Sequence, residues 1–311
     1  MKSRLTLVIP CYNEEQALPI TLRRVDELLA GLIEAGRIAP ESRAVYVDDG
    51  SSDRTWTLIE QAAGNRVGGI KLAGNRGHQH ALLAGLLSVE GDAIVSMDAD
   101  LQDDLGAVAL MLEQHRQGAQ IVYGVRSTRH ADSAFKRITA EGYYRLLKWL
   151  GVDVVFNHAD YRLMSRVAIE ALRGYGEVNL FLRGIVPQLG FKTAQVEYER
   201  AERVAGESKY PLRKMLALAW EGLTSFSPRP LRWITMFGSV VSMLSFIVGL
   251  WALVVRLSGN GHAMPGWAST VIPVYFLGGI QLLSLGIIGE YIAKIYLETK
   301  RRPRFIIEKQ L

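Results

Sequence analysis

The first part of the chain alternates short apolar runs with longer stretches whose apolar residues recur at helical spacing. The runs predict strands and the stretches between them predict helices, the first of which has Leu18, Val25 and Leu29 on one face. This alternation favours an α/β fold with a largely parallel sheet that helices cover on both faces. The predicted strands are Leu5–Ile9, Ala44–Val47, Val67–Leu72, Ala93–Met97 and Gln120–Tyr123.

Polar residues cluster directly after three of these strands, behind Ile9, Val47 and Met97. In a parallel sheet the carboxyl ends of the strands meet at one edge, where such proteins bind ligands. The sequence therefore places a ligand site at that edge. Within the first cluster, Glu14 and Glu15 also predict an acidic first turn for the following helix. Further helices are predicted at Thr55–Ala63, Gly77–Leu87 and Leu105–Gln117.

Beyond Ser227 the chain contains two stretches without a charged side chain, Trp233–Val255 and Trp267–Gly289. Each has about 23 residues and at about 1.5 Å per residue can cross a hydrocarbon layer of about 30 Å. Buried helices of globular proteins rarely need so long an uncharged run, so we predict two transmembrane helices. The predicted divisions are a soluble domain (1–208), an amphipathic juxtamembrane helix (209–230), the two spans (231–293) and a basic tail (294–311).

The charges beside the spans predict their orientation. Arg229 and Arg232 precede the first span and five basic residues follow the second, whereas the connecting segment 256–266 has one Arg and one His. By the positive-inside rule, both termini and the soluble domain are cytoplasmic, and the chain is a multi-pass protein of the inner (plasma) membrane. The single cysteine, Cys11, fits a reducing compartment.

The net charge of +5 could indicate a nucleic-acid partner. The basic residues gather beside the spans, however, so anionic lipid headgroups are the expected partner and nucleic acid is not. Two basic amphipathic segments, Ser133–Leu150 and Lys209–Ser225, are predicted helices. They are either ordinary surface helices or, as we favour for a membrane-bound protein, helices that lie in the membrane interface.

The sharpest chemical signal is the pair Asp98 and Asp100 after the fourth strand. Residues i and i+2 of an extended chain point the same way, so both carboxylates can face one site, where a divalent cation would remove their repulsion. Oxygen ligands of this kind suit Mg²⁺ or Mn²⁺, which can also bridge to a diphosphate. A calcium-binding EF-hand loop would need a glycine and a distant glutamate that are missing here. A zinc site on His78 and His80 would lack further ligands nearby.

The second cluster, Asp48-Asp49-Gly50-Ser51, has two interpretations that can both hold. One of its carboxylates can accept hydrogen bonds from a base or a ribose, while Ser52 or Asp53 caps the helix that begins at Thr55. The segment Gly74–Gly77 precedes the next helix and can pass its backbone close to a nucleotide.

These clusters resemble the opening motifs of inverting glycosyltransferases of family 2, which have the A-type, Rossmann-like nucleotide-sugar fold. The resemblance extends over essentially the whole chain, including both spans. The chain most resembles the polyprenyl-phosphate glycosyltransferases, above all the bactoprenol-phosphate glucosyltransferases, and resembles the dolichol-phosphate mannose synthases more distantly. The segments that carry it are Pro10–Glu15, Asp48–Ser51, Asp98–Gln102, Asp160–Met164, Arg203–Tyr210, Ser225–Ser227, Gly289–Tyr291 and Tyr296–Pro303.

The resemblance implies roles for residues that match the family's motifs. It implies a metal and diphosphate site, nucleoside contacts, a loop that clamps the diphosphate, two basic residues for the acceptor phosphate, and a carboxylate proposed as catalytic base. His78 departs from the lysine that relatives often have. The metal and diphosphate site corresponds to Asp98, Asp100 and Gln102, and the nucleoside contacts correspond to Pro10, Tyr12, Glu14 and Asp48. The loop that clamps the diphosphate corresponds to Arg203, Ser208 and Lys209. The contacts of the acceptor phosphate correspond to Arg126 and Arg137, and the proposed base corresponds to Asp160.

The implied reaction is attack by a polyprenyl (undecaprenyl) phosphate oxygen on the anomeric carbon of a nucleotide sugar, with Mg²⁺ or Mn²⁺ as cofactor. The phosphate is largely ionised already, so Asp160 is either a base or a residue that positions Arg162 or the acceptor. Glucose from UDP-glucose is the first expectation, before N-acetylglucosamine, galactose, mannose or a modified pentose such as an aminoarabinose derivative. A homo-oligomer is expected. A processive polysaccharide synthase and a catalytically silent membrane module are the rival interpretations.

Overall fold

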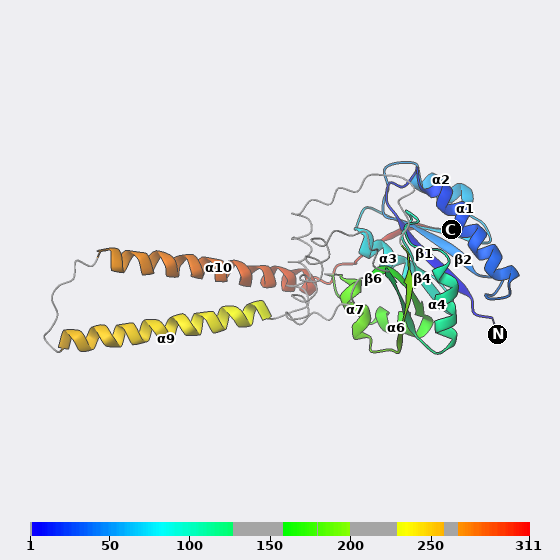
Figure 1. The fold of residues 1–311 in the computed structure, drawn as a ribbon. Helices are drawn as coiled ribbons and strands as arrows, with labels where there is room; N and C mark the ends of the chain where they lie inside the picture. The colour runs from blue at the N-terminus through cyan, green and yellow to red at the C-terminus, as the bar shows by residue number, and fades with distance from the viewer. Residues whose placement is uncertain (1, 127–157, 179, 200–228, 258–266) are drawn as a thin grey trace. The chain divides into compact units, whose positions relative to one another are not determined.

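The computed structural model describes residues 2–126, 158–178, 180–199, 229–257 and 267–311, and eight of its strands form one mixed sheet (Figure 1). The order across the sheet is β7-β5-β6-β4-β1-β2-β3-β8. The five strands predicted from the sequence are all present, with ends that differ by a few residues. The strands are β1 (Leu5–Cys11), β2 (Arg43–Asp48), β3 (Val67–Leu72), β4 (Ala93–Ser96), β5 (Ile121–Arg126), β6 (His158–Ser165), β7 (Thr193–Tyr198) and β8 (Ile307–Gln310).

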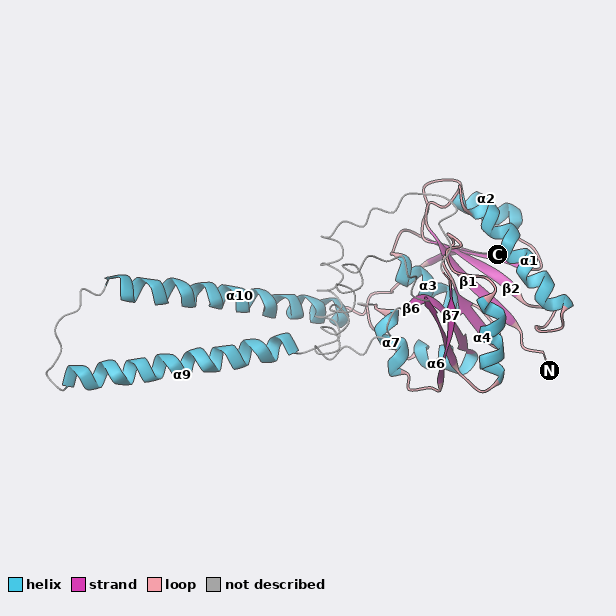
Figure 2. Ribbon diagram, viewed as in Figure 1, coloured by secondary structure: helices cyan, strands magenta, loops and turns pink. Residues whose placement is uncertain are grey.

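Helices cover both faces of this sheet (Figure 2), as the buried apolar strands require. On one face Leu5, Leu7 and Ile9 of β1 belong to the same hydrophobic cluster as residues of α1, α2 and α4. On the other face α3 lies so close to β1 and β2 that its Gly85 has no room for a side chain beside Val8. The helices of the sheet domain are α1 (Leu18–Glu34), α2 (Thr55–Ala62), α3 (His78–Ser88), α4 (Ala107–Arg116), α6 (Arg166–Arg173) and α7 (Leu182–Gln188).

The centre of the sheet is parallel, but two strands run against it. β1 pairs in parallel with β2 and β4, and β2 with β3. β6 lies antiparallel between β4 and β5, with Arg162 opposite both Ser96 and Tyr123. β8 adds an antiparallel edge to β3. The sheet is therefore mixed, and residues 307–310, predicted as part of a basic tail, form one of its strands.

The predicted acidic first turn of the first helix is wrong. α1 begins at Leu18, with Pro19 in its first turn, and no acidic residue lies in that turn. Glu14 and Glu15 instead belong to a turn whose backbone is held by the loop before α2. The amide of Glu14 donates to Thr55 Oγ1 (2.8 Å), and that of Glu15 donates to Asp53 Oδ2 (3.1 Å). The polar residues after β1 therefore form part of the edge at which the strands end, and they do not lie in the first turn of α1.

The contacts within the chain separate two units. One contains residues 1–148, 153–211 and 301–311, and the other contains 149–152 and 212–300 with the long helices α9 (Arg229–Leu257) and α10 (Trp267–Thr299). α9 and α10 cover the two uncharged stretches, and they contact each other. Among the described residues, one stretch, Phe276–Thr299, is long and apolar enough to cross a membrane, with a mean hydropathy of 1.5.

A single glycine tests the packing of α3 on the sheet. A Cβ at Gly85 would lie 2.4 Å from Val8 Cγ1 and 2.8 Å from Val47 Cγ2, and valine side chains are stiff. We expect Gly85→Ala to lower the free energy of unfolding by about 1–3 kcal/mol, as overpacking does. Gly31→Ala in α1 is the matched control, because a Cβ there meets nothing within 4 Å. It should stabilise by about 0.5–1 kcal/mol. Thermal unfolding of the full chain in detergent measures both, and an equally stable Gly85→Ala would contradict the packing.

Candidate active site

The carboxyl ends of β1 and β2 are joined by hydrogen bonds between the loops that follow them. Cys11 and Asp48 are opposite each other in the register of the two strands. Asn13, whose φ of 54° is positive, donates its backbone N–H to Ser51 Oγ (3.0 Å) and accepts the Ser52 amide on Oδ1 (2.9 Å). This bonding brings three predicted nucleoside-contact residues, Pro10, Tyr12 and Glu14, to the same edge as Asp48. Tyr12 is 47 % exposed there.

The neighbours Asp48 and Asp49 have different surroundings. Both Asp49 oxygens accept backbone amides of the loop before α3, from Arg76 at 2.8 Å and Gly77 at 2.9 Å. Among the described residues, Asp48 accepts only from Ser51, at 3.3 Å, and its buried Oδ2 has no hydrogen-bond partner. Burial raises the pKa of the Asp48 carboxyl. Asp49 therefore holds the loop, whereas Asp48 Oδ2 is not bonded by any described residue.

Asp98 lies where several carboxylates approach one another. Its side chain is 38 % exposed, and His78 Nε2 lies 3.5 Å from its Oδ1. Loss of hydration raises the pKa of Asp98 to about 6, and the negative charges of Asp103, Asp160 and Asp100 add to the increase while His78 opposes it. Such a site attracts a positive charge.

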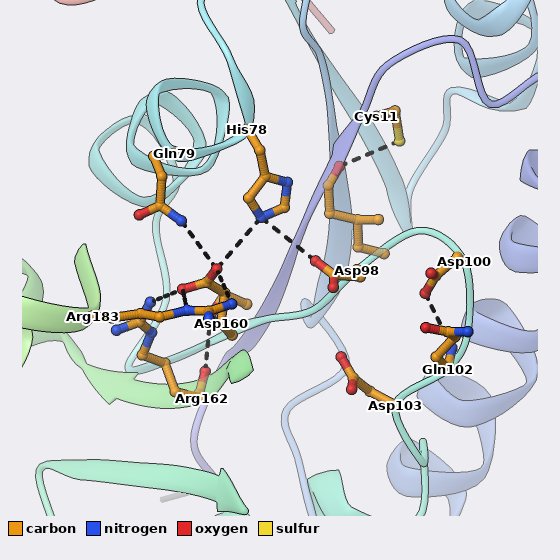
Figure 3. A network of polar contacts seen from close by, with 12 residues as sticks. Cys11, His78, Gln79, Asp98, Asp100, Gln102, Asp103, Asp160, Arg162 and Arg183 are labelled. Carbon is orange, nitrogen blue, oxygen red and sulfur yellow. Dashed lines mark hydrogen bonds and ion pairs between the residues drawn. The ribbon is translucent and has the colours of Figure 1, made fainter. Parts of the chain in front are cut away.

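The loop after β4 presents Asp98, Asp100 and Gln102, as Figure 3 shows. The backbone N–H of Gln102 donates to Asp100 Oδ1 (3.2 Å). Thr21 of α1 fixes the loop by donating its hydroxyl to the Ala99 carbonyl (2.7 Å). Among the described residues no three His, Cys, Asp or Glu side chains form a metal-binding group. Two carboxylates and an amide oxygen fit a hard cation that takes its remaining ligands from a substrate and water, as Mg²⁺ and Mn²⁺ do.

Asp160, on β6, is enclosed by donors from three elements (Figure 3). Its oxygens accept from Arg162 Nη2 (2.7 Å), Gln79 Nε2 (3.0 Å) and Arg183 Nη2 (3.1 Å), and His78 Nε2 lies 3.8 Å away. Burial by itself would raise the pKa of this carboxyl, but Arg183 and Arg162 hold it below its ordinary value. Asp160 is therefore ionised and paired, and a carboxylate of lowered pKa is a weak base.

The remaining predicted residues divide between described and undescribed parts of the chain. Arg126 ends β5, where its Nη2 lies 3.7 Å from Asp103 Oδ1. Arg137, Arg203, Ser208 and Lys209 lie outside the described residues, as do the predicted amphipathic helices Ser133–Leu150 and Lys209–Ser225.

Three residues near Asp160 were not identified as site residues from the sequence. His78 and Gln79 come from the first turn of α3, and Arg183 comes from α7. Arg162, the expected partner of Asp160, lies two positions beyond it on β6 and pairs with it. The departure of His78 from the usual lysine was the one signal for that position. Arg183 lies 23 residues from Asp160, in the short apolar helix α7, and nothing in its local pattern links the two.

The mixed sheet, the strand-end carboxylates and the loop after β4 define an A-type, Rossmann-like glycosyltransferase fold. A mannosyltransferase from Pyrobaculum calidifontis, solved in complex with GDP-Man and Mn²⁺, has a similar fold, with a TM-score of 0.50 at 16 % identity over 97 % of this chain and 89 % of that one. The model of glycosyl transferase family 2 matches residues 6–173. The chain therefore belongs to glycosyl transferase family 2 and is a glycosyltransferase.

Similarity to individual members extends over nearly the whole chain. A bactoprenol glucosyl transferase of Shigella phage SfX is 39 % identical over 99 % of both chains. The prophage bactoprenol glucosyl transferase homolog of Escherichia coli is 40 % identical over 98 % of this chain and 99 % of its own. An uncharacterized glycosyltransferase of Bacillus subtilis, YkoT, is 50 % identical over 99 % of this chain and 92 % of its own.

Replacing Asp160 tests whether its charge is structurally required. Asp160→Asn leaves the buried Arg162 without its anion, so we expect a loss of at least about 3 kcal/mol of unfolding free energy. Because the folded pKa is depressed, the contribution is complete above the unfolded pKa of about 3.9 and declines progressively as the pH falls from there through the folded pKa. Thermal unfolding of both proteins at pH 7 and at pH 3–4 measures this difference.

Asp26→Asn is the matched control for that substitution. Asp26 pairs with Arg66 at 2.6 Å, but both side chains are about 40 % exposed, and a surface pair contributes at most about 1 kcal/mol. A loss in Asp160→Asn no larger than in Asp26→Asn would show that the Asp160 charge does not stabilise the fold.

Proposed function

We propose that the chain transfers a hexose, with inversion, from a nucleoside diphosphate sugar to a polyprenyl phosphate at the cytoplasmic face of the membrane. Glucose from UDP-glucose and undecaprenyl phosphate are the first donor and acceptor to test. The observation that carries the proposal is that the Asp98 and Asp100 carboxylates and the Gln102 amide lie in one loop at the strand-end edge to which Asp48 also belongs. The full-length relatives named as bactoprenol glucosyl transferases support the acceptor.

The donor's two ends would meet different parts of the edge. Asp48 Oδ2, which no described residue bonds, suits a hydrogen bond from the base or ribose, beside Pro10, Tyr12 and Glu14. Asp98, Asp100 and Gln102 would hold Mg²⁺ or Mn²⁺, and the cation would neutralise charge on the leaving diphosphate. Arg203, Ser208 and Lys209 are proposed, from the family resemblance, to clamp that diphosphate.

The acceptor needs positioning more than it needs a base. The second ionisation of a phosphate monoester has a pKa of about 6, so at neutral pH the attacking oxygen is already charged. Asp160 is held ionised by two arginines. We therefore assign Asp160 the role of orienting Arg183 near the acceptor rather than that of a general base. Arg126 and Arg137 are the proposed contacts of the acceptor phosphate.

The membrane helices would bring this site to a lipid that stays in the bilayer. We propose two spans, within α9 and α10, with both termini and the sheet domain in the cytoplasm, because basic residues flank the spans on that side. The basic tail residues fit anionic headgroups. A homo-oligomer in the membrane remains part of this proposal, on the strength of the family resemblance.

The transfer itself is tested with the purified full chain in detergent. Undecaprenyl phosphate is incubated with a panel of radiolabelled nucleotide sugars, with Mg²⁺, Mn²⁺ or a chelator. We expect labelled lipid from UDP-glucose, and a loss of at least about 100-fold in Asp98→Asn and Asp100→Asn, as for removal of transition-state charge stabilisation. Asp104→Asn, an exposed carboxylate of the same loop, should stay within about twofold. Absence of labelled lipid from every donor would refute the proposal.

Cysteine labelling in intact cells tests the orientation. Ser258→Cys, between the spans, should react with a membrane-impermeant maleimide, whereas Glu27→Cys, at an exposed position on α1, should react only after lysis. The wild type, whose single cysteine Cys11 is buried, supplies the background. Labelling of Glu27→Cys in intact cells would place the sheet domain outside.

A further inference from the structure

Another acidic side chain of the loop after β4, Asp103, contacts side chains at the ends of β5 and β7. Asp103 and Tyr198 are both buried, at 2 % and 4 % exposure. Tyr198 donates its hydroxyl to Asp103 Oδ1 at 2.5 Å, and Arg126 donates Nε to the same hydroxyl oxygen at 3.2 Å. Arg126 Nη2 lies 3.7 Å from Asp103 Oδ1. The three side chains therefore form a closed triangle.

The triangle joins the ends of two strands to the loop after β4. Arg126 and Tyr198 are the last residues of β5 and β7 and are opposite each other in the parallel register, while Asp103 comes from the loop that also carries Asp100 and Gln102. Tyr198 sits immediately before the segment that leads to Arg203, and Arg126 immediately before the one that leads to Arg137. The segments that follow Tyr198 and Arg126 in the sequence thus each contain a residue proposed to contact a substrate.

The Tyr198 hydroxyl completes this arrangement. This hydroxyl donates to Asp103 and accepts from Arg126 at once, which fixes the direction of the guanidinium. The Tyr198 ring is held edge-on against Tyr161, with ring centroids 5.2 Å apart and planes at 89°, and the Tyr161 hydroxyl donates to the Asp104 carbonyl (2.8 Å). Burial and the charge of Asp103 raise the pKa of Tyr198, so the hydroxyl stays protonated as a donor at neutral pH.

The same residue is also linked to the donor side. Asp103 directly follows Gln102 in the loop that carries Asp98 and Asp100, so the backbone of this loop connects it to the proposed cation site. Arg126 is 28 % exposed at its side chain and so retains a surface for a ligand while its other side is anchored. An anchored, preorganised arginine binds a phosphate at a lower entropic cost than a mobile one.

We propose that Asp103 and Tyr198 are positioning residues that hold Arg126 for the phosphate monoester of the acceptor. Through the shared loop they fix the place of that phosphate relative to the donor site. This inference rests on the proposed function, since it takes Arg126 as the acceptor contact. The ligand chemistry is that of a phosphate on a lipid, approached from the ends of β5 and β7.

The test compares Tyr198→Phe with wild type in the detergent transfer assay, varying undecaprenyl phosphate and UDP-glucose separately. Loss of a hydrogen bond to a charged group should raise KM for the lipid phosphate by about 5- to 30-fold. KM for the donor should stay within about twofold. Tyr46→Phe is the matched control, because Tyr46 is a buried tyrosine of the same sheet whose hydroxyl has no hydrogen-bond partner in the described part of the chain, and it should change neither KM.

A double-mutant cycle separates positioning from mere packing. In an Arg126→Ala background Tyr198→Phe should change KM for the lipid phosphate less than about twofold, because the pathway through Arg126 is already gone. Asp103→Asn should act in the same direction as Tyr198→Phe and serves as the second variant if Tyr198→Phe does not fold.

Three results would overturn the inference while leaving the proposed function intact. These are an unchanged lipid KM in both variants, an equal rise in both KM values, and a full effect of Tyr198→Phe in the Arg126→Ala background. Failure of the wild type to label any lipid phosphate would instead refute the proposed function, and this inference with it.

Discussion

The structure depends on how negative charge is compensated where the strands end. Asp98, Asp100, Asp103 and Asp160 lie close enough together that three of them raise the pKa of the fourth. Asp160 is compensated by buried and half-exposed arginines, and Asp103 by Arg126 and Tyr198. The pKa of Asp98 is raised to about 6, first by loss of hydration and then by the repulsion of its three neighbouring carboxylates. A divalent cation bound there would relieve it, which is why a diphosphate and its cation suit this edge.

The antiparallel insertion of β6 makes this compensation possible. Because β6 lies between β4 and β5, Arg162 is buried opposite Ser96, and Asp160, which is also buried, lies beside the first turn of α3. Gln79 then links Asp160 to α7 by accepting the Leu182 amide (3.0 Å). The same arrangement brings the Arg183 guanidinium to the site. A parallel strand at this place would need a crossover connection, and its residues would pair with β4 and β5 in a different register.

The parts predicted from the sequence are those whose signal is local. Strands β1 to β4 are short, mostly buried runs, and Asp98 and Asp100 closely follow β4, so both these strands and the carboxylate edge were predictable. β6 was not, because Asp160 and Arg162 interrupt its apolar pattern. β8 was not, because its exposed edge residues resemble a charged tail. The partners of Asp160 and Asp103 come from elements up to 95 residues away in sequence, and only the fold brings them together.

The central claim is that the Asp98 and Asp100 carboxylates bind a diphosphate through a divalent cation. It is tested most directly by titrating UDP into the full chain in detergent by calorimetry, with Mn²⁺ or with a chelator. We predict that Mn²⁺ tightens UDP binding to the wild type by at least about tenfold, and that Asp98→Asn loses this gain. Equal UDP affinity of the wild type with and without the cation would contradict the account.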